Sequence, residues 1–337
     1  MPHRYMLLLL LCIFSLPIFA QQVEMLTSGT KTSIRGLSVV SDNIVWVSGS
    51  GGTVGKSVDG GKNWQWIKVK GFEKNDFRDI EAFSDKVAII MAIAEPAYIL
   101  KTTDGGENWN VVYSDSTKGA FIDAMDFYDK KNGVAVGDPI DSKFYIIKTR
   151  NGGNTWTRTP SVMQSNAVAG EGCFASSGTN IIYFKNKDYL FVSGGLQSRL
   201  HDDSGGRIIP MIQGKESTGA NSIAVLKRTF RVGNRIVVTG GDFANDKDTT
   251  KNCLLSNDAG NSWIRPATPP AGYRSCVIYI NKKKLLTCGT SGIDISNDKG
   301  MNWQPVSKEG FHVCAKAKKG KVVYLAGGNG KIAKMQF

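Results

Sequence analysis

Hydrophobic and polar positions alternate along this chain in short runs, separated by turns rich in glycine and aspartate. One unit shows the order clearly: residues 122–128, 134–137 and 144–149 predict three successive strands, and a fourth starts at Trp156. Runs of Val, Ile, Tyr and Phe bounded by Gly and Asp are typical of β-strands. No segment after the first twenty residues has a convincing helical period, so we expect an all-β fold.

An eight-residue pattern, Ser/Thr-x-Asp/Asn-x-Gly-x-x-Trp, follows the third strand of most units; residues 102–109 are its clearest copy. The Asp or Asn side chain can hydrogen-bond the backbone two residues on, which makes a turn. The Gly can take a positive φ, and the Trp buries a large apolar surface that anchors the turn. The residues expected to build these boxes are Asp59, Trp64, Asp104, Trp109, Asn151, Trp156, Asp258, Trp263, Asp298 and Trp303, with Asp203 in a decayed copy that has Ile208 in place of Trp.

The boxes recur roughly every 40 to 55 residues, a period that matches one four-stranded propeller blade. The last unit is one strand short, because only residues 321–326 and 330–337 follow its first strand. Residues 22–26 form a spare strand, and we expect it to complete the last blade, so that the closed ring hides its edges. This predicts a single propeller domain over residues 21–337 with seven blades. Six or eight blades are the alternatives, because residues 161–255 are irregular.

The first twenty residues have a different character. Arg4 supplies a positive start, residues 6–14 an apolar stretch and Ala20 a small residue before cleavage. These features predict a signal peptide over residues 1–20 and an exported protein, periplasmic or secreted. The apolar stretch is short for a membrane span and nothing like it recurs, so we expect no transmembrane segment in the mature chain.

The charge composition limits the classes of partner that we expect. The chain has 42 basic and 29 acidic residues, a formal net charge of +13. The basic residues are spread along the chain, with clusters at the predicted hairpin turns 282–284 and 316–321. For an exported monomer this favours a protein or an anionic surface polymer as partner over nucleic acid.

Cysteines leave two alternatives open. Five remain after the leader, so at least one is unpaired. Cys276 and Cys288 flank the predicted turn at 281–284. They could form a cross-strand disulfide in an oxidising compartment, or they could be two free thiols buried as small apolar residues.

Neither a metal nor a cofactor is expected. Asp242, Asp246 and Asp248 offer oxygen ligands that suit Ca²⁺, but their spacing fits no dedicated loop. Only three histidines are present, and His3 lies in the predicted leader. Residues 49–57 resemble a phosphate-binding loop, yet Ser50 stands where glycine is needed and no helix is predicted to follow.

The boxes resemble the Asp-box, or BNR, repeats of sialidases and related β-propellers. Over its mature length the chain is also similar to the photosystem II stability/assembly factor type of propeller, through the boxes and through Gly133–Pro139 and Glu171–Thr179. Photosystem-associated members of that family act as assembly chaperones that bind a protein partner, and some bacterial relatives are labelled oxidoreductase. The resemblance implies a non-enzymatic binding or assembly-factor-like module, with a sialidase-like glycoside hydrolase as the alternative and an oxidoreductase supported by the label alone.

Candidate ligand-binding residues lie at the starts of the first strands, on the face opposite the boxes. Aligning these starts gives one column, Arg35, Arg78, Arg274 and His312, in blades that neighbour one another around the ring. Converging guanidinium groups would suit a carboxylate or another anion. The alternative is that these arginines form ordinary salt bridges, for example with Asp79.

Acidic residues are expected on the other arc of the same mouth. The members of this set are Asp123, Asp138, Asp141, Glu171 and Asp242. Asp138 with Asp141, or Glu171 with Asp242, could serve as the acid and base of a glycosidase. The alternative is that they form turns, as Asp138-Pro139 is typical of one. The Arg-Ile-Pro start of sialidases is absent, and no Tyr/Glu nucleophile pair can be assigned.

Overall fold

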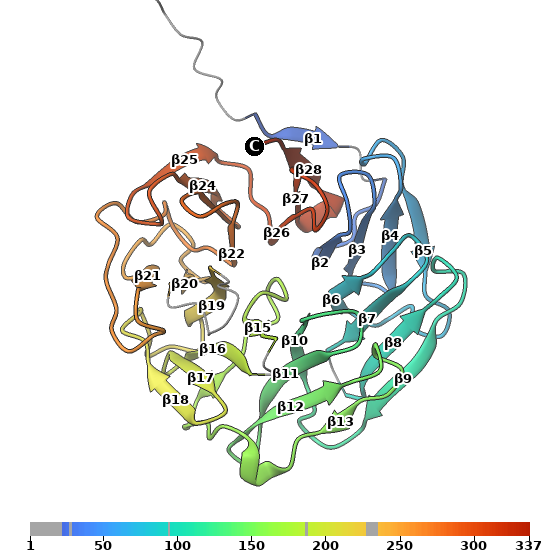
Figure 1. Cartoon of the computed structure of the whole chain (residues 1–337), viewed down its shortest axis with the longest axis horizontal. Coiled ribbons are helices and arrows are strands. Elements are labelled where there is room, and N and C mark those ends of the chain that lie inside the picture. The colour runs from blue at the N-terminus through green and yellow to red at the C-terminus, as the bar shows by residue number, and fades with distance from the viewer. Residues whose placement is uncertain (1–21, 27–28, 94, 186–187, 227–234) are drawn as a thin grey trace, which may run out of the picture.

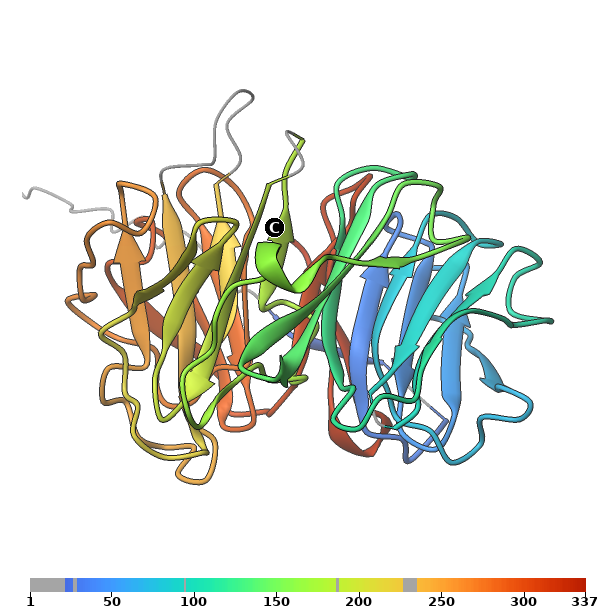
Figure 2. The same cartoon turned by 90° about the horizontal axis from the view of Figure 1, so that it is seen from below.

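The computed structural model describes residues 22–26, 29–93, 95–185, 188–226 and 235–337. These form a closed ring of antiparallel sheets (Figure 1). In the side view, the strands run roughly parallel to the axis of the ring (Figure 2). The only helices in the described ranges are two 3-10 turns, η1 (Ser161–Met163) and η2 (Gly328–Gly330). Neither is long and apolar enough to cross a membrane. The predicted leader, residues 1–20, lies outside the described residues.

Four sheets are simple meanders of four strands, each ordered as in the sequence. The first comprises β2 (Ile34–Val39), β3 (Val45–Gly49), β4 (Thr53–Ser57) and β5 (Gln65–Lys68). The second comprises β6 (Phe77–Ala82), β7 (Ala88–Ala92), β8 (Ala97–Thr102) and β9 (Asn110–Asp115). The third comprises β10 (Ile122–Phe127), β11 (Gly133–Ile140), β12 (Lys143–Thr149) and β13 (Thr157–Arg158). The fourth comprises β22 (Cys276–Tyr279), β23 (Leu285–Gly289), β24 (Gly292–Ser296) and β25 (Trp303–Ser307).

The middle of the chain forms one sheet of eight strands. Its strands are β14 (Glu171–Gly172), β15 (Ile181–Tyr183), β16 (Tyr189–Gly195), β17 (Arg199–Asp202), β18 (Gly205–Ile208), β19 (Thr218–Val225), β20 (Ile236–Asp242) and β21 (Cys253–Ser256). Its two arms are joined by the single pair Gly194↔Gly219, where a Cβ on Gly219 would lie 2.5 Å from the Cα of Gly194. The predicted count of seven blades requires a division at this pair; undivided, the described residues form six sheets.

The ring closes as the sequence predicts. The last sheet has the order β1 (Glu24–Leu26), β28 (Ile332–Met335), β27 (Val323–Ala326) and β26 (Val313–Lys316). In it, Glu24 pairs with Lys334 and Leu26 with Ile332 in antiparallel register. The expected N-terminal strand therefore completes the sheet that the C-terminal strands leave one short.

Each box is a turn held by its own side chains. In the copy after β8, Thr102 Oγ1 accepts a hydrogen bond from the Gly106 amide at 3.0 Å and donates one to Asp104 at 2.8 Å. The Asn108 amide and side chain both donate to the Asp104 carboxylate and lower its pKa. Trp109 then packs edge-on against Trp46 of the neighbouring sheet, with ring centroids 6.4 Å apart. The box thus joins a turn to the core between sheets.

The decayed copy does not form a box, which corrects the expectation for Asp203. Residues 203 and 204 are the tight turn of the β17–β18 hairpin, in which Asp202 pairs with Gly205. Asp202, not Asp203, accepts hydrogen bonds from the Ser204 amide and from Arg207. Ile208, in the position of the missing Trp, is 60% exposed, so this turn lacks the aromatic anchor of the other copies.

Candidate functional site

Three first strands share one irregularity near the ring axis. The pairing register shifts around Arg35 in β2, around Arg78 in β6 and around Asp123 in β10, so each of these residues is the extra residue of a bulge. A bulge changes the direction of the side chain it carries. All three side chains line one cavity at the centre of the ring.

A connecting segment of small residues crosses this centre. We call residues 173–180, between β14 and β15, the axial segment; Figure 1 shows the chain beside β15 reaching into the middle of the ring. Arg35 Nη1 donates to the carbonyl oxygen of Ser176 at 3.3 Å, and Arg78 Nη1 to that of Ala175 at 3.2 Å. Ser177 Oγ donates to the carbonyl oxygen of Ser275 at 2.7 Å. The segment therefore bonds to sheets on both sides of the ring.

The cavity above the axial segment is the candidate site, and we call it the axial cavity. Its volume is about 410 Å³. It opens on the side of the strand starts, away from the boxes, as the two-sided sorting of the loops predicts. Its ionisable lining residues are Arg35, Arg78, Asp123, Asp138 and His312, and its aromatic lining includes Phe174 and Tyr273.

A second cavity of about 310 Å³ lies at the other ends of the first strands. We call it the apolar cavity, because residues such as Ile182, Val225 and Ile278 line it. Gly178 and Thr179 of the axial segment also face it. The axial segment thus borders both cavities.

The carboxyl groups of the axial cavity favour their protonated form. Asp123 is fully buried, and within the described residues neither carboxylate oxygen has a geometrically well-formed hydrogen bond. Burial, followed by the nearby Asp138, raises the pKa of Asp123 well above its ordinary value, and Arg78 only partly opposes this. Burial also raises the pKa of Asp138, although the Cys173 amide donates to that carboxylate at 2.8 Å.

Two basic residues of the axial cavity, Arg35 and His312, have lowered pKa values. Burial, then the adjacent Arg78, lowers the pKa of Arg35, since two like charges lie close together in a poorly hydrated place. Burial and Arg35 lower the pKa of His312 to about 4, so its imidazole is neutral near pH 7. His312 Nδ1 donates to the carbonyl oxygen of Ile34 at 2.9 Å.

Arg274, the third arginine of the expected column, does not line the axial cavity. Its Nε lies 2.5 Å from Asp294 Oδ2, and its Nη1 donates to the carbonyl oxygen of Tyr273 and to Ser291. Both charged side chains of this pair are buried. Of the four residues that the sequence alignment grouped, Arg35, Arg78 and His312 therefore lie at the axial cavity. Arg274 instead forms a buried structural ion pair. The salt-bridge alternative fits Arg274, and it applies in part to Arg78, whose Nε lies 2.6 Å from Asp76.

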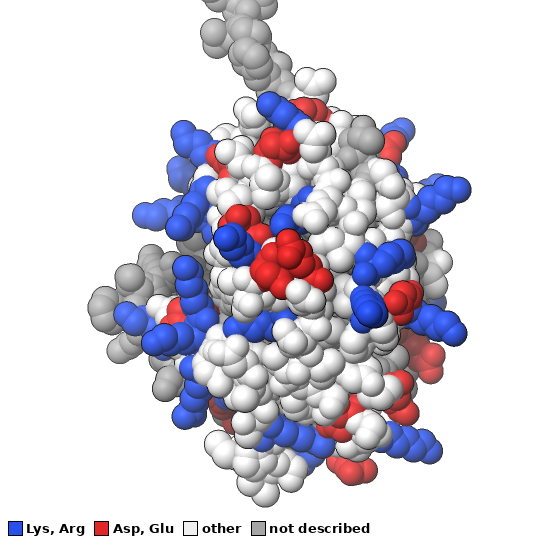
Figure 3. All heavy atoms as spheres, turned by 90° about the vertical axis from the view of Figure 1, so that its right-hand side faces the viewer, with Lys and Arg blue, Asp and Glu red and all other residues white. Residues whose placement is uncertain are grey.

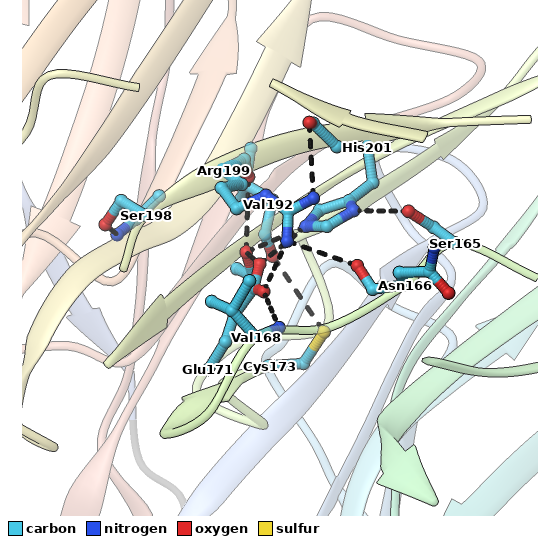
Figure 4. Close-up of polar contacts among 12 residues, drawn as sticks. Ser165, Asn166, Val168, Glu171, Cys173, Val192, Ser198, Arg199 and His201 are labelled. Atoms are coloured by element: carbon cyan, nitrogen blue, oxygen red, sulfur yellow. Dashed lines mark hydrogen bonds and ion pairs between the residues drawn. The ribbon is translucent and has the colours of Figure 1, made fainter. Parts of the chain in front are cut away.

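Glu171 belongs to a separate buried network (Figure 4). Its carboxylate accepts hydrogen bonds from Arg199 at 2.9 Å and from the Val168 amide at 2.9 Å, and it also contacts His201 Nε2 at 2.7 Å. Ser165 Oγ completes the chain of contacts at His201 Nδ1, 2.8 Å away. The expected pairing of Glu171 with Asp242 is therefore not present, because the Glu171 carboxylate is fully used in holding β14 to β16 and β17.

The other expected acids are also dispersed. Asp141 is exposed in the turn between β11 and β12, with φ of 51°, so it does not face Asp138 across a cavity. Asp242 is buried, and although burial opposes this, hydrogen bonds from Ser217 and the Ala244 amide lower its pKa. Asp246 accepts a hydrogen bond from Thr290, and Asp248 one from the Thr250 amide. These three acids form no common cation site in the described structure.

Cysteines give one cluster that the sequence did not indicate. All five cysteines of the described residues are free and buried, including Cys276 and Cys288, which pair across β22 and β23. Cys314 of the neighbouring sheet joins them, and these three form the only group of potential metal ligands of this size among the described residues.

Sequence reasoning also missed the axial segment. Its first residues, 173–176, line the axial cavity together with Tyr273, whose hydroxyl donates a hydrogen bond to the buried Asn221 at 2.8 Å. The available signal was the run of small residues at 175–179, between the third box and the decayed copy. Such a run does not reveal which distant strands the segment touches.

Charged side chains are more widely separated on the outer surface than in the axial cavity. On the side seen in Figure 3, which is the right-hand side of Figure 1, Lys and Arg occur singly or in small groups, with Asp and Glu between them. The positive charge is distributed over this side, as its spread along the sequence indicates.

Residues 18–119 match the family model described as photosynthesis system II assembly factor YCF48. No curated protein sequence matches the chain. Among solved structures, it is similar to one described as "YCF48 bound to D1 peptide", with a TM-score of 0.63 at 16% identity over 96% of this chain and 97% of the other. It is also similar to "YCF48 from Cyanidioschyzon merolae", with a TM-score of 0.64 at 16% identity over 93% of this chain and 98% of the other. In its boxes, its strand order and its closed ring, the chain is an all-β BNR-repeat propeller that resembles the YCF48 type of assembly factor.

Proposed function

We propose that this chain is a non-enzymatic binding module that holds an anionic group of a protein partner in the axial cavity. One observation carries this proposal: Arg35 and Arg78, the bulge residues of two adjacent sheets, line the wall of the same cavity. Within the described residues Arg35 forms no ion pair and donates only to the Ser176 carbonyl, which leaves most of its five N–H donors unused. An anion bound beside both guanidinium groups would relieve their repulsion and take up these donors.

The similar structure described as bound to a D1 peptide supports a peptide as the class of partner. A peptide offers carboxylates at its C-terminus and on its acidic side chains, which suit the arginine pair. An anionic surface polymer is the second source of the same chemistry, and the binding experiment below separates the two.

The test is a titration of the purified chain with short peptides that end in a free carboxylate, with their amidated counterparts, and with a soluble polyanionic glycan. We expect tighter binding of the free acids, and a loss of roughly 10- to 100-fold in Arg35→Ala and in Arg78→Ala, because a hydrogen bond to a charged group contributes about 1.5–3 kcal/mol. Arg150→Ala is the matched control, since Arg150 is exposed beside a box. Equal binding of acid and amide, or binding unchanged in both cavity variants, refutes the proposal; a preference for the glycan assigns the site to a polymer.

A second candidate function, glycoside hydrolysis, is favoured by Asp123 and Asp138, which share the axial cavity and both have raised pKa values. A raised carboxyl pKa is what a general acid in glycoside hydrolysis requires. The test is turnover of fluorogenic glycosides by the purified chain and by Asp123→Asn. Turnover abolished in the variant supports hydrolysis, and absence of turnover across a broad glycoside panel removes this candidate.

We also propose that the chain acts after export. The proposal rests on the leader-like pattern of residues 1–20 and on no described contact. N-terminal mass spectrometry of the protein from its native cells is expected to find a mature start next to Ala20. A native protein that retains Met1 and the apolar stretch contradicts export by this route.

A further inference from the structure

Three cysteine sulfurs from two adjacent sheets meet in the core. Cys276 begins β22, Cys288 lies opposite it on β23, and Cys314 lies on β26 of the next sheet. Their Sγ atoms all lie within 4.8 Å of one another, and those of Cys276 and Cys314 are 3.6 Å apart. All three side chains are free thiols with 0% exposure.

The position of these residues is unusual within the ring. Cys276 and Cys314 occupy equivalent places in the first strands of neighbouring sheets, where β2 has Leu37 and β6 has Ile80. Two adjacent sheets therefore have sulfur where others have a branched apolar side chain, and a third sulfur faces them from Cys288. The other two cysteines of the described residues, Cys173 and Cys253, do not belong to this group.

Hydrogen bonds link two of these sulfurs to the backbone and to each other. The Cys314 amide donates to Cys276 Sγ at 3.4 Å, the Cys314 thiol donates to the same sulfur, and the Cys276 thiol donates to the carbonyl oxygen of Cys314 at 3.3 Å. A metal ion binds the deprotonated form of cysteine, so binding here releases protons from these thiols.

The spacing of the sulfurs fits a bound metal ion, and the number of ligands distinguishes between ions. An ion bound in the plane of three sulfurs, about 2.3 Å from each, requires sulfurs about 4.0 Å apart. The Cys276 and Cys314 sulfurs are 3.6 Å apart, and no pair of the three is more than 4.8 Å apart, so small movements suffice to reach this value. Zinc normally takes a fourth ligand, and no histidine or carboxylate of the described residues joins the group. A soft ion that is satisfied by thiolates alone fits better.

We propose that Cys276, Cys288 and Cys314 form a binding site for one copper(I) ion. Binding replaces thiol protons, which leave to solvent, and it involves no change of oxidation state. The ion links β22 and β23 to β26, and so it fastens two neighbouring sheets of the ring. This site is separate from the axial cavity and does not depend on the function proposed for it.

The experiment is an anaerobic titration of the full chain with copper(I) held by a chromophoric chelator, followed by X-ray absorption at the copper edge. We expect one equivalent per chain with three sulfur neighbours and no nitrogen, and a rise in Tm on loading. These measurements on the unaltered chain do not require any variant to fold.

Variants then locate the ion. The double substitution Cys276→Ala and Cys314→Ala is expected to lose the bound equivalent and the rise in Tm, whereas Cys173→Ala with Cys253→Ala is expected to keep both. Failure of the unaltered chain to bind one equivalent, or binding retained by the Cys276 and Cys314 variant, overturns the proposal. A Cys276–Cys314 disulfide in protein trapped with a thiol-blocking reagent as its cells are opened also overturns it, in favour of a redox pair.

Discussion

At the scale of single residues, a bulge in each of three first strands places one ionisable side chain in the axial cavity. Arg35, Arg78 and Asp123 are each the extra residue of a bulge and face the ring axis. Arg274 aligns with the first two in sequence but precedes the first residue of β22, and its guanidinium is held by Asp294. Equivalent positions in a repeat therefore have different roles when a buried partner is present.

Asp123 gives a pH-dependent prediction. Its folded pKa is raised, so the native state holds the proton more firmly than the unfolded chain does. The stability from this proton is fully present below the unfolded pKa of about 3.9 and is lost as the pH rises through the raised folded value. Asp123→Asn stays neutral throughout, so we expect the Tm of this variant, relative to that of the unaltered chain, to rise as the pH rises above the unfolded pKa of about 3.9. Thermal scans at increasing pH measure this margin.

Asp129 is the control, because its pKa is shifted in the opposite direction from that of Asp123. It is exposed, and although the little burial it has acts to raise its pKa, hydrogen bonds from the Asn132 and Lys131 amides lower it. Its contribution is present above the unfolded pKa and lost as the pH falls through the lowered value. Asp129→Asn is therefore expected to lower the Tm near neutral pH, with a difference that closes in acid. Margins independent of pH in both variants contradict this account of the two carboxyl groups.

The sequence was sufficient to place Arg35, Arg78 and His312 on one mouth, because strand order alone fixes which loops share a face. It was not sufficient to exclude Arg274. The signal was Asp294, a charged residue between Ile293 and Ile295, which must find a partner if this segment is a buried strand. Which of the many arginines supplies the partner depends on side-chain direction, and the pattern of residues does not contain this.

At the scale of elements, the boxes and the axial segment represent two different ways of fixing a loop. A box holds itself, since its Ser or Thr, Asp and Trp lie within eight residues. The axial segment is held by residues far away in sequence, such as Arg35 and Ser275. Local patterns consequently predicted the intact boxes, whereas the axial segment and the failed copy at Asp203 became visible only in three dimensions.

The box hydroxyl should contribute measurably to stability. Thr102→Val removes the acceptor of the buried Gly106 amide and the donor to Asp104 while keeping the shape of the side chain. An unsatisfied buried donor costs about 1–3 kcal/mol, so we expect the midpoint of urea unfolding to fall accordingly. Thr249→Val, at an exposed position, is the matched control and should change the stability by less than about 0.5 kcal/mol. Equal midpoints for the two variants would show that the hydroxyl is dispensable.

The axial segment depends on a glycine that meets a buried acid. Gly178 has φ of +67°, and a Cβ there would lie 2.4 Å from the Asp79 carboxyl group. Gly119 has φ of +83° with no atom within 4 Å of its Cβ position, so Gly119→Ala measures the backbone cost alone, about 1 kcal/mol. We expect Gly178→Ala to be more destabilising than Gly119→Ala, because Asp79 or the segment must move. Unfolding midpoints of both variants give the comparison, and equal losses contradict a tight contact at Asp79.

At the scale of the whole molecule, the ring depends on a strand of three residues. β1 covers the edge of β28, and the Lys334 ammonium, 3.2 Å from the Glu24 carboxylate, adds an ion pair to the backbone register. Uncovered edges invite pairing with other chains. The sequence predicted this closure correctly, because a missing strand at one end and a spare strand at the other are both visible in the pattern.

Removing the closing strand should open the ring to association. A chain that begins after Leu26 is expected to have a lower Tm than a chain that begins at Gln22, and to form dimers or larger species through the free edge of β28. Size-exclusion chromatography with light scattering distinguishes these states. If the shortened chain remains a monomer with an unchanged Tm, the last sheet does not need its fourth strand.

The axial segment also connects the two ends of the ring. Ala175 and Ser176 border one cavity, and Gly178 and Thr179 border the other, so a single stretch of chain separates them. A displacement of this stretch toward one opening therefore enlarges one cavity at the expense of the other, and occupancy on the arginine side would be felt at the apolar side through the backbone that they share.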